Sequence, residues 1–173
     1  MEALVSAGFF KGVLDLTTTE WCDELFGGVL SAGPHRLEAA GRAGVPQVVS
    51  VGALDMVNFG AWETVPEKFK SRKLYRHNPT VTLMRTAAEE NAKLGGIIAG
   101  KLNAAAGKTA LMLPLSGVSM LDAPGQAFYG EEEDKALFEA LRTIIDREKV
   151  ELIEMENNIN DMEFALAAAK KLI

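Results

Sequence analysis

The sequence alternates short apolar runs with stretches that have the spacing of amphipathic helices, and this alternation constrains the fold more than any other feature. The apolar runs are rich in Val, Leu and Ile, as strands buried on both faces of a parallel sheet should be. Strands that alternate with helices predict an α/β domain with helices on both faces of the sheet. We therefore expect a Rossmann-like three-layer domain with a mainly parallel sheet of about five strands. The expected strands are residues 11–16, 46–51, 80–84, 108–113 and 150–155.

Three Thr-x-x-Glu sequences precede predicted helices, at Thr17–Glu20, Thr64–Glu67 and Thr86–Glu89. This is the spacing of a capping box, in which the Thr and Glu side chains satisfy N–H groups that the first turn of a helix leaves free. The free N–H groups after Thr17 and Thr18 are also suited to binding an anion. Capping is the favoured interpretation.

Length and charge exclude several classes of protein. A chain of 173 residues suits a single domain, residues 1–173, and its net charge of −6 argues against nucleic acid or an anionic membrane as a partner. One cysteine cannot form an intrachain disulfide, which fits a reducing compartment. The sequence has no apolar run of membrane-spanning length and no basic leader before its first apolar residues. We expect a cytoplasmic protein that binds a small molecule.

In parallel α/β sheets, ligands bind beyond the carboxyl ends of the strands. The segments that follow the predicted strands are polar or rich in glycine. They include GALDMVNFG at 52–60 and LPLSGVSMLDAPGQAFYG at 113–130. The second segment has too much Gly and Pro for a helix and too many apolar residues for an ordinary solvated loop. We expect it to cross the mouth of the sheet.

The loop 113–130 should bury Leu115, Met120 and Leu121 and re-enter the fold through Phe128 and Tyr129. Its polar side chains should then point towards segments 17–19 and 52–58, with His77 or Arg85 on the rim of the cleft. Arg85 directly follows a predicted strand, so it either pairs with a carboxylate of its own domain or binds a ligand anion. The candidate ligand-binding residues are Thr17, Thr18, Gly52, Asn58, Asn78, Arg85, Ser116, Ser119, Asp122 and Gln126.

Evidence for catalysis is weaker, and whether the protein is an enzyme stays open. His77 is a plausible base and Asp55 a plausible partner for acid–base work on a small carboxylated or phosphorylated substrate. A serine nucleophile is disfavoured because the sequence has no G-x-S-x-G turn. The near-matches to a phosphate-binding loop at Gly100-Lys101 and at 107–109 lack required residues. Two histidines and one cysteine do not make a zinc site, although Asp55 and Asp122 are candidates to hold Mg²⁺ with a phosphate.

Several long strings resemble one family. GALDMVNFG, HNPTVTLMRT, GVSMLDAPGQ, TTTE with GGVLSAGP, and IND at 159–161 are similar to the C-terminal half of the uncharacterised family typified by the plant tobamovirus-resistance ATP-binding protein. The resemblance covers nearly the whole chain. It implies the second of two Rossmann-like domains, with ATP bound chiefly by the first domain or the cleft beside it. In this chain Asn158 occupies a position where family members usually carry His.

The resemblance also implies that Met1 and Glu2 fall inside a family motif, after a strand and a glycine-rich turn. We therefore expect a domain that acts with a missing N-terminal domain or partner chain. It should self-associate through an apolar face that includes Phe9, Phe10 and Val13, and it should bind ATP weakly by itself. The leading hypothesis is a module for a small anionic ligand or a nucleotide. The alternatives are half of an enzyme site and a docking scaffold.

Overall fold

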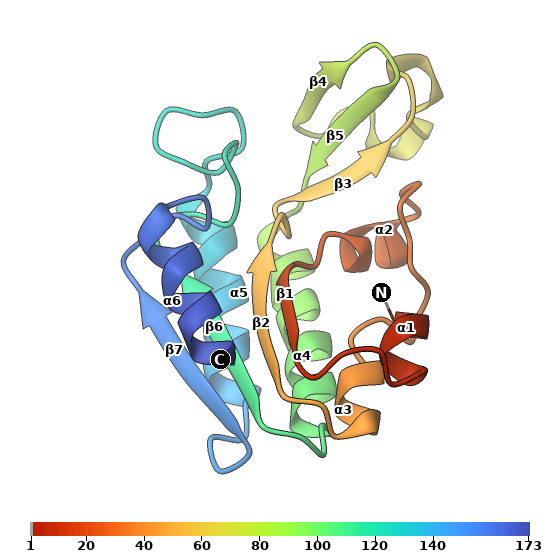
Figure 1. Ribbon diagram of the computed structural model, residues 1–173. Coiled ribbons are helices and arrows are strands. Elements are labelled where there is room, and N and C mark those ends of the chain that lie inside the picture. The colour runs from red at the N-terminus through yellow and green to blue at the C-terminus, as the bar shows by residue number, and fades with distance from the viewer. Residues whose placement is uncertain (1) are drawn as a thin grey trace.

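The computed structural model describes residues 2–173, so Met1 lies outside the described residues, and it contains two β-sheets (Figure 1). The larger sheet has four parallel strands in the order β1-β2-β6-β7. These strands are β1 (Val13–Thr17), β2 (Gln47–Gly52), β6 (Thr109–Pro114) and β7 (Val150–Met155). Every residue of the two central strands, β2 and β6, is buried, as expected for strands covered on both faces.

The smaller sheet is antiparallel and projects beyond the carboxyl ends of the parallel strands (Figure 1). Its order is β3-β5-β4, with β3 at Met56–Phe59, β4 at Leu74–Asn78 and β5 at Val81–Arg85. Two 3-10 helices, Trp62–Thr64 and Glu67–Phe69, lie between β3 and β4.

The small sheet corrects the prediction for residues 80–84. They form a strand, but β5 pairs antiparallel with β3 and β4, so the parallel sheet has four strands and not about five. The physical reason is the connection. Only Pro79 and Thr80 separate β4 from β5, and so short a link joins antiparallel neighbours, whereas parallel strands need a long crossover.

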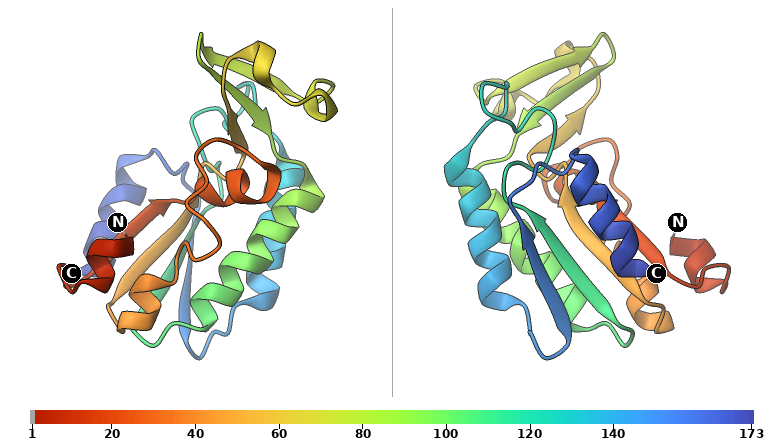
Figure 2. Two further views of the ribbon diagram at one scale, coloured as in Figure 1. Left: turned by 90° about the vertical axis from the view of Figure 1, so that its right-hand side faces the viewer. Right: turned by 60° about the vertical axis from the view of Figure 1, so that its left-hand side comes forward.

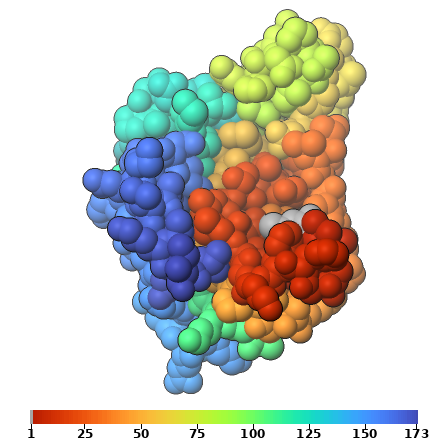
Figure 3. All heavy atoms as spheres, in the orientation of Figure 1, coloured from red at the N-terminus to blue at the C-terminus, as the bar shows by residue number. Residues whose placement is uncertain are grey.

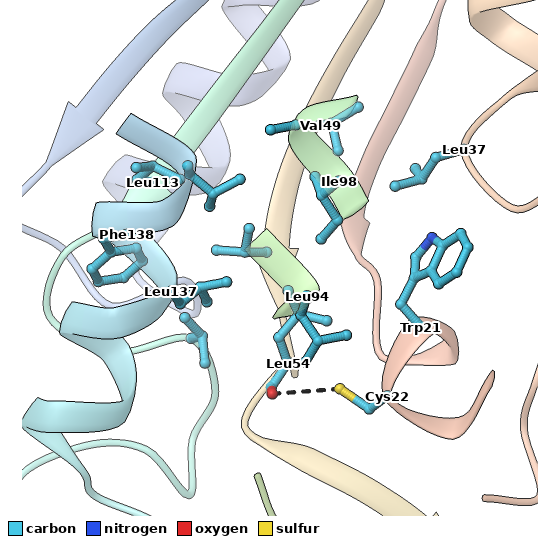
Figure 4. Packing of buried hydrophobic residues seen from close by; sticks show 14 of the residues in the cluster. Trp21, Cys22, Leu37, Val49, Leu54, Leu94, Ile98, Leu113, Leu137 and Phe138 are labelled. Carbon is cyan, nitrogen blue, oxygen red and sulfur yellow. Dashed lines mark hydrogen bonds between the residues drawn. The ribbon is translucent and has the colours of Figure 1, made fainter. Parts of the chain in front are cut away.

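Helices cover both faces of the parallel sheet, as predicted (Figure 2). On one face lie α2 (Glu20–Phe26), α4 (Ala88–Asn103) and α5 (Glu131–Ile144). Their apolar side chains form one core with Val49 of β2 and Leu113 of β6 (Figure 4). On the other face, α6 (Met162–Leu172) packs on Val48, Ala110 and Met112. Because neighbouring residues of a strand point to opposite faces, each central strand contributes to both cores.

Two shorter helices lie beside β1. The helix α3 (Ala39–Ala43) lies next to α4. Two contacts connect them: Lys101 on α4 pairs with Glu38 just before α3, and the Ala106 N–H after α4 donates to Gly41 O. The helix α1 (Glu2–Ser6) places Val5 against Val13 and the α3 alanines.

The predicted capping boxes do not form as expected. The helix α2 begins at Glu20 without a side-chain cap, and the Thr18 hydroxyl donates instead to Ser50 O at 3.3 Å. At the start of α4, Glu90 and not Glu89 accepts a backbone N–H, that of Ala87, at 2.7 Å. Thr64 donates to Ala61 O within a 3-10 turn. The spacing identified the helix starts to within a few residues, but it did not identify the bonds that fix them.

Candidate functional site

A hollow of about 290 Å³ lies at the carboxyl ends of β1 and β2. It is formed where these strand ends meet the loop after β6 and the segment after β7. Carboxyl ends of parallel strands are where ligands bind in this class of sheet. The lining residues are Leu16, Thr17, Gly52, Ala53, Val118, Ser119, Met120, Ile159 and Asn160, and we call this hollow the carboxyl-edge pocket.

At the base of the pocket, the backbone of Gly52 packs closely against Leu16 and Ile159. A Cβ atom at Gly52 would lie 2.4 Å from Leu16 O and 2.6 Å from the Ile159 Cδ1 atom, so only glycine fits there. The next residue, Ala53, has a φ of 56°, in the left-handed region that alanine rarely adopts. Its N–H donates to Val118 O at 2.8 Å, which ties the strained turn to the loop after β6. Backbone strain of this kind gathers at functional sites.

Ser119 connects the pocket to a buried carboxyl group. Its hydroxyl donates to Asp55 Oδ2 at 2.7 Å and accepts the N–H groups of Leu121 and Asp122 at 3.0 and 3.1 Å. Both lone pairs of the oxygen are therefore occupied, which opposes a role as nucleophile. Burial raises the pKa of Asp55 to about 6, against the lowering effects of the Ser119 hydrogen bond and the Arg85 charge. The other oxygen, Asp55 Oδ1, is buried without a hydrogen-bond partner.

Behind the pocket, Arg85 is held entirely by its own domain. Its Nε donates to Phe128 O at 2.8 Å, and its Nη2 lies 2.9 Å from Asp134 Oδ1 and 3.3 Å from Asp122 Oδ1. Only 4% of the residue is exposed. Of the two alternatives that the sequence left open, the structure shows pairing with carboxylates of the same domain.

Asp122 has a structural part in this cluster. Its Oδ2 accepts the Val118 N–H at 2.9 Å, which closes the turn that carries Ser119. Burial, together with the hydrogen bond and charge of Asp134, raises the pKa of Asp122 to about 8. The side chain is fully buried, so it contacts the turn and Arg85, not the pocket.

The predicted binding residues are only partly brought together. Thr17, Gly52 and Ser119 line the pocket, although they are far apart in the sequence. Thr18 is buried beneath it. Asn58 lies beside α2, where its Nδ2 donates to the Thr19 hydroxyl at 3.1 Å and its N–H donates to Asp23 Oδ1 at 2.7 Å. Neither Thr18 nor Asn58 lines the hollow.

The structure does not bring His77 and Asp55 together. The register pairs Met56 with Arg85 at one end of the small sheet and Asn78 with Val81 at the other. His77, which is exposed, therefore lies roughly 10 Å along the sheet from the end where Asp55 sits. Asn78 accepts the Thr80 N–H and so fixes the hairpin turn.

The loop 113–130 crosses the strand ends but buries fewer residues than expected. Val118 and Phe128 are buried, whereas Leu115 and Leu121 are half-buried. Met120 is 73% exposed, contrary to the prediction, because it stands at the lip of the pocket. The remaining predicted residues, Ser116, Gln126 and Tyr129, are exposed.

Sequence reasoning missed Ala53, Ile159 and Asn160 as parts of the pocket. All three residues lie inside the strings GALDMVNFG and IND, which resemble the family. However, their residue types do not indicate that they line a pocket at a strand end. Asn158, next to them, donates to Ser119 O at 3.0 Å and fastens the two loops together.

A larger hollow, of about 600 Å³, lies at the opposite, amino edge of the parallel strands. Its basic side chains are exposed, and two of them already pair with neighbouring carboxylates, Lys149 with Asp146 and Lys171 with Glu151. This edge is not where parallel sheets bind ligands.

Among residues 2–173 no group of three or more His, Cys, Asp or Glu side chains is arranged to hold a metal ion. Over the same residues, each helix is too short or too polar to traverse a lipid bilayer.

Comparison with known proteins identifies the family of this chain. Residues 1–173 match the C-terminal domain of the uncharacterised protein family UPF0261. The chain belongs to this family. It is 64% identical over 173 residues to a UPF0261 protein of Clostridium tetani and 53% identical over 171 residues to one of Rhizobium meliloti. It is also 46% identical over 168 residues to the ToMV resistance protein Tm-1(GCR237) of Solanum lycopersicum.

These alignments cover 100%, 97% and 96% of the chain. They cover only 43% and 42% of the two bacterial proteins and 22% of the tomato protein. The chain therefore spans less than half the length of these relatives.

Proposed function

We propose that this domain binds a small ligand in the carboxyl-edge pocket and that another part of the longer family polypeptide completes the site. The observation that carries this proposal is the convergence of Thr17, Gly52 and Ser119 around one hollow whose floor includes the strained Ala53. A fold does not keep a left-handed alanine without some compensation, and a shaped binding surface is one such compensation.

The size and chemistry of the pocket restrict the ligand. Its volume of about 290 Å³ is at the lower end for small-molecule sites, so it suits one part of a nucleotide or of another small anionic ligand. The lining offers hydroxyl, amide and backbone groups together with apolar surface, and it includes no charged side chain. The charge of an anionic ligand, and any Mg²⁺ that accompanies it, must then be balanced by the other part of the protein.

The enzyme hypothesis loses its motivation, because His77 and Asp55 lie apart and Ser119 has both lone pairs occupied. We therefore favour binding over catalysis for the residues in hand.

The experiment compares two proteins by isothermal titration calorimetry with ATP and with ADP, each with Mg²⁺. One is residues 1–173, and the other is a chimera in which the N-terminal remainder of the Clostridium tetani relative precedes residues 1–173. The chimera should bind at least about tenfold more tightly, because it supplies the missing walls and charges. Equal affinity would show that the site is complete without the remainder, and binding by neither protein would overturn the nucleotide proposal.

A matched pair of methionines tests the position of the site. Met120 and Met162 are both 73% exposed, but only Met120 lines the pocket. In the chimera, Met120→Trp should obstruct the pocket and weaken binding by about tenfold or more, whereas Met162→Trp should leave it unchanged. Equal effects of the two substitutions would place the ligand elsewhere.

A further inference from the structure

One edge of the parallel sheet lacks a neighbour although the fold around it is arranged for one. β1 pairs with β2 alone among the strands of residues 2–173. The Val13 N–H donates to Pro46 O at 2.9 Å, so Val13 faces β2. In a parallel ladder alternate residues bond to alternate sides, and the N–H and C=O groups of Leu14 therefore point away from β2.

The connections of the sheet all follow one rule. From β1 to β2, from β2 to β6 and from β6 to β7, the chain moves one strand further in the same direction. Each of these connections contains a helix on the face that carries α3, α4 and α5. Crossovers between parallel strands share one handedness, so the face of the helix fixes the direction of the step.

The helix α1 lies on this same face. The Glu2 carboxylate accepts the N–H groups of Leu37 and Ala39, both at 2.9 Å, and Val5 packs on Val13 and α3. Both ribbon views place α1 beyond the β1 edge of the sheet (Figures 1 and 2). A crossover helix in this position joins β1 to a strand on the side of β1 opposite β2, which is the free side.

The surface around this edge is apolar. Phe9 is 72% exposed, and Phe10 and Leu14 are also exposed. Figure 3 shows residues 2–12 and the end of α6 side by side near this edge, and Leu172 of α6 reaches the backbone at Gly12. Val13 was expected on the exposed apolar face, but it is buried against Val5 of α1.

We propose that the free edge of β1 is the docking surface for an additional parallel strand, supplied by the polypeptide that makes up the rest of the longer family members. The added strand bonds to the outward N–H and C=O groups of Leu14. Its side chains cover Phe9 and Phe10, and α1 is its crossover helix. This proposal stands on the topology and is independent of ligand binding in the carboxyl-edge pocket.

Hydrogen exchange measured by mass spectrometry tests the proposal in residues 1–173 and in the Clostridium tetani chimera, without added nucleotide. Amides of the β1 peptide should exchange about tenfold or more slowly in the chimera, because the added strand protects them. The peptide of β7, the other edge strand, is the internal control and should be unchanged. Equal β1 exchange in the two proteins would overturn the proposal. So would protection in residues 1–173 alone that rises with protein concentration, since a second copy would then be the occupant.

A proline variant gives a second readout. Leu14→Pro removes an N–H that β2 does not use, and proline is tolerated on edge strands in that orientation. Residues 1–173 should keep their thermal midpoint within a few degrees, whereas the midpoint of the chimera should fall clearly. The control is Leu30→Asp, which changes another exposed leucine away from β1 and should affect the two proteins alike. A proline effect of the same size in both proteins would also contradict the proposal.

Discussion

Two buried arginines, Arg36 and Arg85, each tie an irregular segment to a strand, but they do so with different electrostatics. Arg36 forms a fork on Asp15, with Nη2 at 2.7 Å from Oδ1 and Nη1 at 2.5 Å from Oδ2. Arg85 instead divides its donors between the carbonyl oxygen of Phe128 and two carboxyl groups, Asp122 and Asp134.

The pKa values differ accordingly. Burial disfavours the Arg36 cation, but the Asp15 hydrogen bond and the charges of Asp15, Glu20 and Glu2 outweigh burial, so the pKa of Arg36 is raised. Near Arg85 burial has the larger effect on the carboxyl groups, and Asp122 and Asp55 have raised pKa values of about 8 and about 6. In the first region the carboxylates stabilise the Arg36 cation, whereas in the second region Asp122 holds a proton at neutral pH.

The largest effect should come from removing Arg36. Arg36→Met leaves the Asp15 carboxylate buried without its partner, so the free energy of unfolding at neutral pH should fall by about 3–5 kcal/mol. Urea denaturation followed by circular dichroism measures the loss. Arg42→Met is the control, since Arg42 pairs with Glu38 on the surface and should change stability by less than about 0.5 kcal/mol. Similar losses in the two variants would show that the Asp15 fork is not stabilising.

Arg85→Met should cost less than Arg36→Met near neutral pH, roughly 2–3 kcal/mol, because Asp122 holds a proton at that pH and so leaves less buried charge without a partner. The loss should grow as the pH rises from about 6 to about 8.5, because the Arg85 charge lowers the pKa values of Asp55 and Asp122, so the folded variant keeps their protons to a higher pH than the unmodified protein does. Urea denaturation at both pH values measures this. A loss that does not vary with pH would remove the distinction between the two regions.

The raised carboxyl pKa values predict how the unmodified protein responds to pH. Burial raises the pKa of Asp55 from 3.8 to about 6, so between these values the folded state binds more protons than the unfolded state. Stability attributable to Asp55 is therefore fully present below about pH 4 and declines as the pH rises towards 6, by at most about 3 kcal/mol. Asp55→Asn should make this decline shallower in thermal unfolding measured from pH 4 to pH 7. An unchanged slope would mean that Asp55 titrates normally.

The smallest effect concerns the turn before Asp55. Ala53→Gly should remove the cost of a left-handed alanine, offset in part by the greater freedom of glycine in the unfolded chain. The net gain should be no more than about 1 kcal/mol, measured by thermal unfolding. Gly52→Ala is the opposite control, because its Cβ would collide with Leu16 O, and it should destabilise clearly. Destabilisation by Ala53→Gly would show that this backbone is not strained.

Much of the architecture could be predicted because burial on two faces leaves a simple mark in the sequence. The central strands are mostly apolar runs, and so their place in a parallel sheet was predictable. β5 is also mostly apolar and buried, so its own residues do not show whether its neighbours run parallel or antiparallel to it. Its neighbour β4 is half exposed and polar at its end, so it carried no strand pattern.

The candidate site was predictable to the extent that it depends on strand ends. Thr17 and Gly52 end their strands, and Ser119 follows one closely, so these three were found. The partners of Arg85 were not, because Asp122 and Asp134 come from a loop and from α5, which only the tertiary fold brings together. The prediction that Met120 is buried was wrong, because the sequence alone does not distinguish an apolar residue at the edge of a pocket from one in the core.

The small antiparallel sheet begins and ends at nearly the same point, because the Thr86 N–H donates to Asp55 O at 3.0 Å. This hydrogen bond and that from the Thr86 hydroxyl to Leu54 O at 2.8 Å close residues 56–85 into a side branch. The end of β2 and the start of α4 therefore lie close together, as they would if a short loop joined them. The branch thus adds little to the entropic cost of bringing β2 and β6 together in the parallel sheet. The exposed hairpin end of this branch, at Pro79 and Thr80, can therefore take insertions without disturbing the strand order of the parallel sheet.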